Sequence, residues 1–144
     1  MRQTMRPAAG SMRHVITSLV VDDSESVRRL LRGLLEAEGY MVHEAADGQA
    51  ALELLRRNRL RYVVLLDGEM PVLSGWELLY AAEVEGGDLF AQHHFILMTA
   101  DRRQIPSWCS EFLEERNIAV IEKPISPQTL SRLMADATLR LTAR

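Results

Sequence analysis

Polar residues that could do chemistry together follow four short apolar segments of this chain. They are Asp22, Asp23, Asp67, Thr99 and Lys123. Three clustered carboxylates repel one another and raise one another's pKa unless a cation lies among them. Mg²⁺ suits such a set, because it prefers hard oxygen ligands, keeps several waters and often binds a phosphate as well. The residue types therefore predict a magnesium site that handles phosphate.

A carboxylate beside Mg²⁺ can attack phosphorus and form an acyl phosphate. Phosphoryl transfer then needs mainly positioning and charge neutralisation, which Mg²⁺ and Lys123 would supply. The Thr99 hydroxyl would donate a hydrogen bond to a phosphoryl oxygen. Taken singly, each of these residues is more often a helix cap, a turn residue or a solvated charge. Their joint occurrence at the ends of successive strands favours a functional site.

Apolar runs typical of buried parallel strands alternate with segments of helical periodicity. The predicted strands cover residues 15–21, 40–46, 62–66, 95–98 and 118–121, and the second, less apolar one is predicted to lie at a sheet edge. The predicted helices begin near Ser24, Asp47, Ser74, Pro106 and Ser126. This alternation predicts an α/β flavodoxin-like fold, a doubly wound sheet of five parallel strands in the order 2-1-3-4-5. The polar strand ends then share one edge, where such sheets bind ligands.

Four separated motifs resemble those of bacterial response-regulator receiver domains in two-component signalling, including chemotaxis regulators. The motifs are Val20-Val21-Asp22-Asp23, Leu65-Leu66-Asp67-Gly68-Glu69-Met70-Pro71 with Gly75, Met98-Thr99-Ala100, and Lys123-Pro124. The resemblance spans residues 14–142, and the motifs agree in residue type, spacing and predicted strand. It implies a receiver domain over residues 14–144. Residues 1–13 are predicted to be a disordered lead-in, because Pro7 and Gly10 interrupt local structure.

The resemblance implies a phosphorylation-activated module of a two-component phosphorelay. Asp67 would accept the phosphoryl group from the phosphohistidine of a sensor histidine kinase or a histidine phosphotransfer protein. Mg²⁺ would be held by Asp22, Asp23, Asp67 and the backbone carbonyl of Glu69. Such a module is not an enzyme, apart from its own aspartyl phosphorylation and dephosphorylation.

The same resemblance assigns the switch. Thr99, Ala100 and Lys123 would be the phosphate-binding and switch residues, with the small Ala100 leaving the site accessible and a cis peptide before Pro124. The family often has an aromatic residue three positions before the lysine, where this chain has Val120. A readout that depends on an aromatic ring turning inward is therefore not expected here.

Two further carboxylates stand beside the expected path of hydrolytic water. Glu69 lies two residues after the predicted phosphoacceptor, and Asp101 lies two residues after Thr99. Receivers vary at these positions, so both residues are expected to tune the lifetime of the phosphoryl group. We predict that Glu69 pairs with Lys123 at rest and alters the hydrolysis rate after phosphorylation.

Composition limits the partners. The net charge is −3, so no basic surface favours direct nucleic-acid binding. The apolar runs are far shorter than the ~20 residues of a membrane-spanning helix. With one cysteine, Cys109, the chain forms neither an internal disulfide nor a cysteine-based zinc site, and a cytoplasmic location is expected. The downstream protein is unknown, and a homodimer through the fourth helix, fifth strand and fifth helix is a further expectation from the resemblance.

Three rival interpretations remain open from the sequence. A Mg²⁺-dependent phosphohydrolase would use the same aspartyl nucleophile, although this chain has Glu69 where haloacid-dehalogenase-like phosphatases have a second aspartate and lacks their lid domain. A degenerate module would bind partners without phosphorylation, against which the complete set of site residues argues. A flavin-binding protein would need a phosphate-binding loop after the first strand, where Asp22 and Asp23 would instead repel phosphate.

Overall fold

The computed structural model describes residues 16–57, 60–85 and 88–144. Five parallel strands form one sheet in the order β2-β1-β3-β4-β5, which confirms the predicted fold class and strand order. β2 lies at one edge, as its weaker apolar character predicts. The predicted lead-in at residues 1–13 lies outside the described residues. The strands are β1 (Thr17–Val21), β2 (Met41–Ala45), β3 (Tyr62–Asp67), β4 (His94–Thr99) and β5 (Ala119–Glu122).

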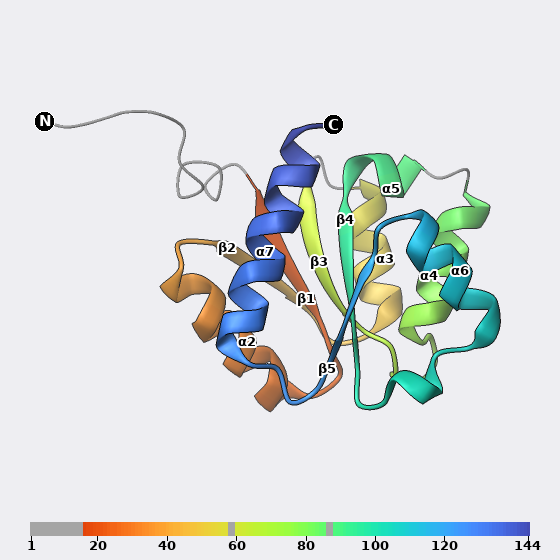
Figure 1. Ribbon diagram of the computed structural model, residues 1–144, viewed down its shortest axis with the longest axis horizontal. Coiled ribbons are helices and arrows are strands. Elements are labelled where there is room, and N and C mark those ends of the chain that lie inside the picture. The colour runs from red at the N-terminus through yellow and green to blue at the C-terminus, as the bar shows by residue number, and fades with distance from the viewer. Residues whose placement is uncertain (1–15, 58–59, 86–87) are drawn as a thin grey trace, which may run out of the picture.

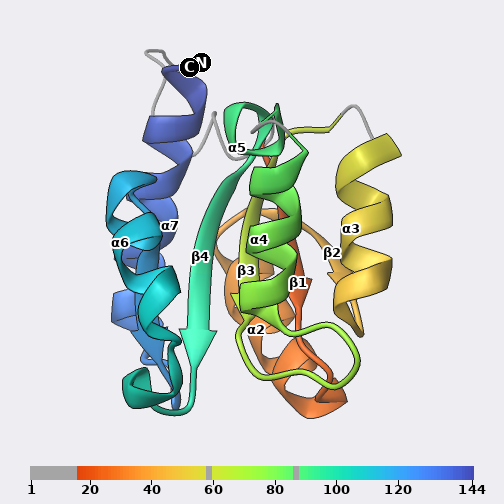
Figure 2. The ribbon, with the colours of Figure 1, turned by 90° about the vertical axis from the view of Figure 1, so that its right-hand side faces the viewer.

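Helices cover both faces of the sheet (Figure 1). α2 and α7 pack on one face, and α3, α4, α5 and α6 pack on the other, each face with its own group of buried apolar side chains. In Figure 2, α4 lies between α3 and α6 in front of the sheet. None of the described helices is both long and apolar enough to cross a membrane. The helices are α2 (Glu25–Ala37), α3 (Gly48–Arg57), α4 (Gly75–Val84), α5 (Asp88–Gln92), η1 (Arg102–Gln104, a 3-10 helix), α6 (Ser107–Glu115) and α7 (Pro127–Thr142).

Successive residues of the central strands enter different faces of the core. Leu19 and Val64 pack toward α3 and α4, whereas Val20 and Leu65 pack toward α2 and α7. Side chains alternate across a strand, so a sheet that is covered on both faces needs apolar residues at nearly every position. This is why the strands read as nearly continuous apolar runs, and why the polar residues gather at the strand ends.

The helix starts follow the predicted caps. The Ser24 hydroxyl accepts a hydrogen bond from the Val27 N–H at 3.3 Å. Ser74 and Glu77 form a reciprocal capping box at the start of α4, and the Ser126 hydroxyl caps α7. Such caps satisfy backbone N–H groups that have no partner inside the helix. The residue at which each of these helices begins is therefore determined by its own capping side chain.

Two local features differ from the prediction. Pro106 stands at the N-cap of α6 instead of inside its first turn. The short helix α5 is not predicted at all, because five residues are too few to show helical periodicity. Neither difference moves a strand end.

Gly75 allows the start of α4 to cross the end of β3. A Cβ atom at Gly75 would lie only 2.4 Å from the Asp67 carbonyl oxygen. The Gly75 N–H donates to the Gly68 carbonyl at 2.9 Å, which holds this crossing in place. Trp76 covers Gly68 so closely that a Cβ atom there would meet the indole ring at 2.5 Å. The backbone around Asp67 is therefore fixed by close packing that any larger residue would disturb.

Two buried histidines at the opposite end of β4 make stability depend on pH. His93 and His94 are 1% and 3% exposed, and burial lowers the pKa of each imidazole from 6.5 to about 4. The unfolded chain binds protons as the pH falls through 6.5, whereas the folded chain does not until about 4. Stability therefore falls as the pH is lowered across this window, by about 1.4 kcal/mol per pH unit for each histidine.

Replacing His93 by Gln is expected to halve the histidine part of this acid sensitivity. The slope of unfolding free energy against pH, measured by urea denaturation between about pH 4.5 and 6.5, should become shallower by about 1 kcal/mol per pH unit. The slope is the quantity to compare, because a change in packing shifts the unfolding free energy by the same amount at every pH and leaves the slope unchanged. An unchanged slope would show that His93 is protonated in the folded protein.

Candidate functional site

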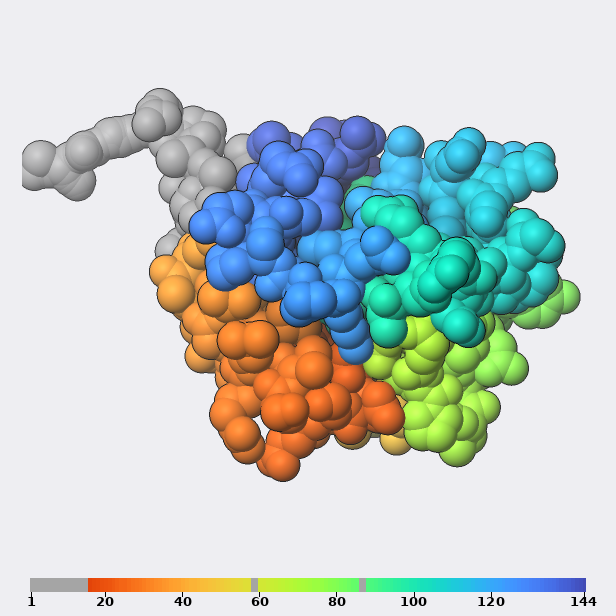
Figure 3. Space-filling view, turned by 60° about the horizontal axis from the view of Figure 1, so that its bottom comes forward, coloured from red at the N-terminus to blue at the C-terminus, as the bar shows by residue number. Residues whose placement is uncertain are grey.

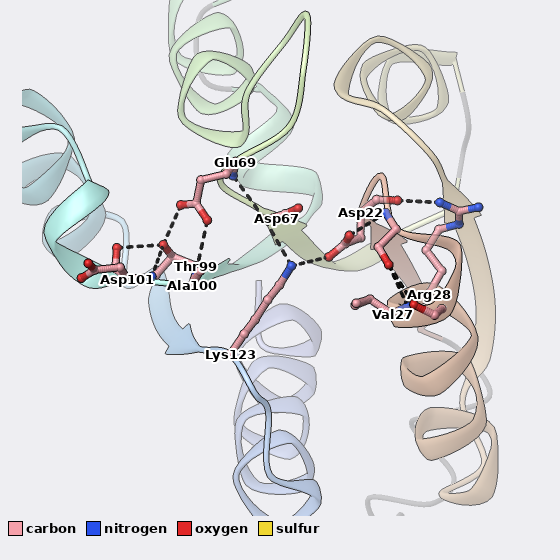
Figure 4. A network of polar contacts seen from close by, with 11 residues as sticks. Asp22, Val27, Arg28, Asp67, Glu69, Thr99, Ala100, Asp101 and Lys123 are labelled. Carbon is pink, nitrogen blue, oxygen red and sulfur yellow. Dashed lines mark hydrogen bonds and ion pairs between the residues drawn. The ribbon is translucent and has the colours of Figure 1, made fainter.

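The predicted site residues converge at the carboxyl edge of the sheet. Because β1, β3, β4 and β5 are neighbouring parallel strands in register, Asp22, Asp67, Thr99 and Lys123 leave the sheet at the same edge. Figure 3 looks at this edge and shows the β1–α2, β3–α4 and β5–α7 segments meeting beside the segment that follows β4. The close-up in Figure 4 shows the side chains directed toward one another.

Three carboxylates form the acidic cluster. Oxygen atoms of Asp22, Asp23 and Asp67 all lie within 4.8 Å of one another. Asp22 is fully buried and Asp67 is 2% exposed, whereas Asp23 is exposed to solvent. Two buried carboxylates and one exposed carboxylate thus offer hard oxygen ligands beside solvent. This donor set fits Mg²⁺, which takes one or two carboxylates, several waters and phosphate oxygens.

Lys123 supplies the positive charge. Its Nζ atom lies 2.7 Å from Asp22 Oδ2 and 3.4 Å from Asp67 Oδ1. Burial lowers the pKa of Lys123, but the hydrogen bond to Asp22 and the charge of Asp67 outweigh burial, so the pKa lies above its ordinary value. Lys123 is also the only lysine among seventeen basic residues. A compact ammonium fits between two carboxylates where a planar guanidinium would need a wider space.

The position of Asp67 makes ionisation of its carboxyl group less favourable. Burial, followed by the nearby charge of Asp22, raises the pKa of Asp67 from 3.8 to about 6, although Lys123 lowers it. The Glu69 N–H donates to Asp67 Oδ1 at 3.2 Å and also favours the anion. Asp67 is therefore ionised at neutral pH but destabilised by burial and by the charge of Asp22, and a bound cation would stabilise the anion.

Glu69 does not pair with Lys123, so that prediction was wrong. Its carboxylate instead accepts hydrogen bonds from the Thr99 hydroxyl at 2.6 Å and from the Ala100 N–H at 3.1 Å (Figure 4). Lys123 is held by Asp22 and Asp67, because two buried anions attract its ammonium more strongly than one partly exposed anion. The sequence placed all of these groups at one edge but could not decide which donor each carboxylate takes.

Asp101 and Val120 lie at the margin of the site. The Asp101 carboxylate accepts from the Arg103 N–H at 2.9 Å and from the Arg103 guanidinium at 3.0 Å, so it caps η1. Its role in tuning the phosphoryl lifetime stays a prediction. Val120 is partly buried and packs against the buried apolar side chains on the face of the sheet that α6 covers. Its carbonyl accepts a hydrogen bond from the Arg102 guanidinium at 2.7 Å. The cis peptide between Lys123 and Pro124 is present as expected.

The first turn of α2 contains a residue, Arg28, whose role was not predicted from the sequence. Arg28 donates to the Asp22 carbonyl at 2.7 Å and to Glu44 of β2 at 3.0 Å. The Ser24 N–H donates to Asp22 Oδ1 at 2.9 Å. Arg28 thus fixes the backbone that carries the acidic pair. Its spacing of four from Arg32, which also binds Glu44, is the signal that could have identified it.

Comparisons with known proteins agree with this geometry. The chain matches the family model of the response regulator receiver domain over residues 18–135. It is 30% identical over 117 residues to the two-component response regulator ORR11 of Oryza sativa subsp. indica, covering 81% of this chain and 77% of that protein. It is 44% identical over 124 residues to the transcriptional regulatory protein SrrA of Staphylococcus aureus, covering 86% of this chain. The chain spans only 48% of SrrA.

A solved structure supports the fold separately. The CheY-like response regulator receiver domain protein of Methanospirillum hungatei superposes with a TM-score of 0.78, covering 91% of this chain and all of that one. Because the sequence identity is 24%, this similarity shows a shared fold and nothing further.

Proposed function

This chain belongs to the response regulator receiver domain family, and we propose that Asp67 is its phosphoacceptor. Receiver domains are phosphorylation-activated signalling modules of two-component systems, and they bind Mg²⁺ at an acidic pocket. The observation that carries the assignment to Asp67 is its position: a buried carboxylate at the end of β3, within 3.4 Å of Lys123 and beside Asp22 and Asp23.

We propose that each neighbour of Asp67 has a separate task. Asp22, Asp23 and Asp67, together with the Glu69 carbonyl, would hold Mg²⁺, which neutralises phosphoryl oxygens when bound. An Asp67 carboxylate oxygen attacks phosphorus, and the bond to the donor's histidine nitrogen breaks, leaving the imidazole to take up a proton from solvent. Lys123 pairs with a phosphoryl oxygen, since its ammonium already lies between the two buried carboxylates.

Membership of the family indicates the general classes of partner. Response regulators interact with histidine kinases and downstream effectors. For this chain we propose a sensor histidine kinase or histidine phosphotransfer protein as the donor, in the cytoplasm, without direct nucleic-acid contact. A homodimer through α6, β5 and α7 stays a proposal, supported by Trp108 of α6 and Leu139 of α7, which are both 52% exposed. Aromatic side chains such as that of Trp108 are enriched at protein interfaces.

One measurement separates this function from a phosphohydrolase. With Mg²⁺ and acetyl phosphate, intact-mass analysis should show a single phosphoryl group per chain, whereas a small phosphate ester such as p-nitrophenyl phosphate should not be turned over. Asp67→Asn should remain unmodified. Sustained release of p-nitrophenol by the wild type, abolished in Asp67→Asn, would instead assign the site to hydrolysis.

A further inference from the structure

Glu69 occupies the two hydrogen-bond donors that face the predicted phosphoryl position. Both of its carboxylate oxygens are engaged, Oε2 by the Thr99 hydroxyl at 2.6 Å and Oε1 by the Ala100 N–H at 3.1 Å. A hydroxyl donating to a carboxylate at this distance is a charge-assisted hydrogen bond, stronger than one between neutral groups. The contact joins the β3–α4 loop to the segment after β4 (Figure 4).

These donors cannot serve two acceptors at once. A threonine hydroxyl and a backbone N–H each carry one hydrogen. A phosphoryl group on Asp67 presents anionic oxygens of the same kind as the Glu69 carboxylate. Any phosphoryl oxygen that takes the Thr99 hydroxyl or the Ala100 N–H must therefore remove Glu69 from it.

The backbone of Glu69 is held while its side chain competes. Its N–H donates to Asp67 Oδ1 at 3.2 Å, so the residue cannot withdraw as a whole. Its side chain is partly exposed, so solvent can solvate the carboxylate once its two hydrogen bonds are broken. A phosphoryl group adds about −1.5 to −2 of charge, which would repel the Glu69 carboxylate.

We propose that Glu69 is an internal competitor of the phosphoryl group, holding Thr99 and Ala100 until phosphorylation expels its side chain toward solvent. This inference rests on the proposed function of Asp67. Glu69 is then a positioning residue. It holds Thr99 and Ala100 in one arrangement before phosphorylation, and it weakens binding of the phosphoryl group. This chain has Val120 where the family often has an aromatic switch residue. Release of the Glu69 carboxylate is then a change that a partner can detect at the β3–α4 loop.

The test is the affinity for beryllofluoride, an analogue of the phosphoryl group, titrated in excess Mg²⁺ by isothermal titration calorimetry. Glu69→Ala removes both carboxylate acceptors and leaves the Thr99 hydroxyl only the neutral Asp101 carbonyl at 3.0 Å. It is expected to bind beryllofluoride about tenfold more tightly than the wild type, because a charge-assisted hydrogen bond need not be broken. Glu69→Gln keeps a weaker acceptor and should fall between the two. Glu25→Gln makes the same charge change at an exposed position at the start of α2, near the same sheet edge, and should match the wild type.

Two further readouts separate competition from a general structural effect. In a Thr99→Ala background the gain from Glu69→Ala should shrink to less than about threefold, because one contested donor is already gone. In the absence of beryllofluoride, the Ala100 amide proton should shift in NMR spectra of Glu69→Ala but not of Glu25→Gln. Equal or weaker binding by Glu69→Ala overturns the inference while leaving Asp67 as the acceptor. Absence of beryllofluoride binding by the wild type overturns the proposed function, and this inference with it.

Discussion

Replacing Asp67 by Asn is expected to stabilise the metal-free protein by about 3 kcal/mol near pH 7. The pKa of Asp67 rises from 3.8 in the unfolded chain to about 6 in the folded protein, and each pKa unit corresponds to about 1.4 kcal/mol. A raised carboxyl pKa favours folding below the unfolded value and loses that advantage as the pH rises through the folded value. The neutral amide does not carry this penalty, so the predicted phosphoacceptor is a site where function opposes stability.

The pH dependence makes this prediction specific. The difference in unfolding free energy between Asp67→Asn and the wild type should be near zero at pH 3.8 or below, grow between pH 3.8 and about 6, and stay constant above. Mg²⁺ should reduce the difference, because it binds the wild-type carboxylates and stabilises that folded state alone. Asp136→Asn, an exposed carboxylate paired with Arg140 on α7, is a matched control that should change little. A destabilised Asp67→Asn would contradict the account of its charge.

Replacing Lys123 by Met is expected to destabilise the metal-free protein by about 3 kcal/mol near pH 7, because it leaves two buried carboxylates without their cation. Lys123→Arg keeps the charge and should lose less than half as much. The loss should shrink below about pH 6, where Asp67 takes up a proton. Urea denaturation of the three proteins checks this order.

A double-mutant cycle identifies which contact is responsible. In an Asp67→Asn background, Lys123→Met should be less costly, because one of the two carboxylates is already neutral. If both backgrounds lose the same free energy, Lys123 acts through Asp22 alone, which its 2.7 Å contact would permit. A stabilised Lys123→Met in the wild-type background would show that desolvation of the ammonium exceeds its ion pairs.

The fold could be predicted because each of its rules is local and repeated. Nearly continuous apolar runs identify strands buried on both faces, and caps such as Ser24 and Ser74 mark helix starts. The parallel arrangement then sends Asp22 and Asp67 to the same edge without any knowledge of side-chain contacts. The convergence of the acidic cluster was therefore accessible from the order of the elements.

The pairing of charges within the site was not accessible in the same way. Glu69 could reach several donors, and it meets Thr99 and Ala100 while Lys123 pairs with the two buried aspartates. Contacts among long polar side chains depend on differences of an ångström in loops, which hydrophobic periodicity does not encode. Arg28 is a partial case: its spacing from Arg32 indicates a shared partner on a neighbouring element, but not the backbone carbonyl of Asp22 to which it donates.

The most direct test of the central claim is to locate the phosphoryl group. The wild-type protein would be treated with acetyl phosphate in Mg²⁺, the acyl phosphate reduced with borohydride, and the peptides analysed by mass spectrometry. We expect modification at Asp67 alone, lost when Mg²⁺ is chelated and absent from Asp67→Asn. Modification at another residue, or equal modification without divalent cation, would contradict it.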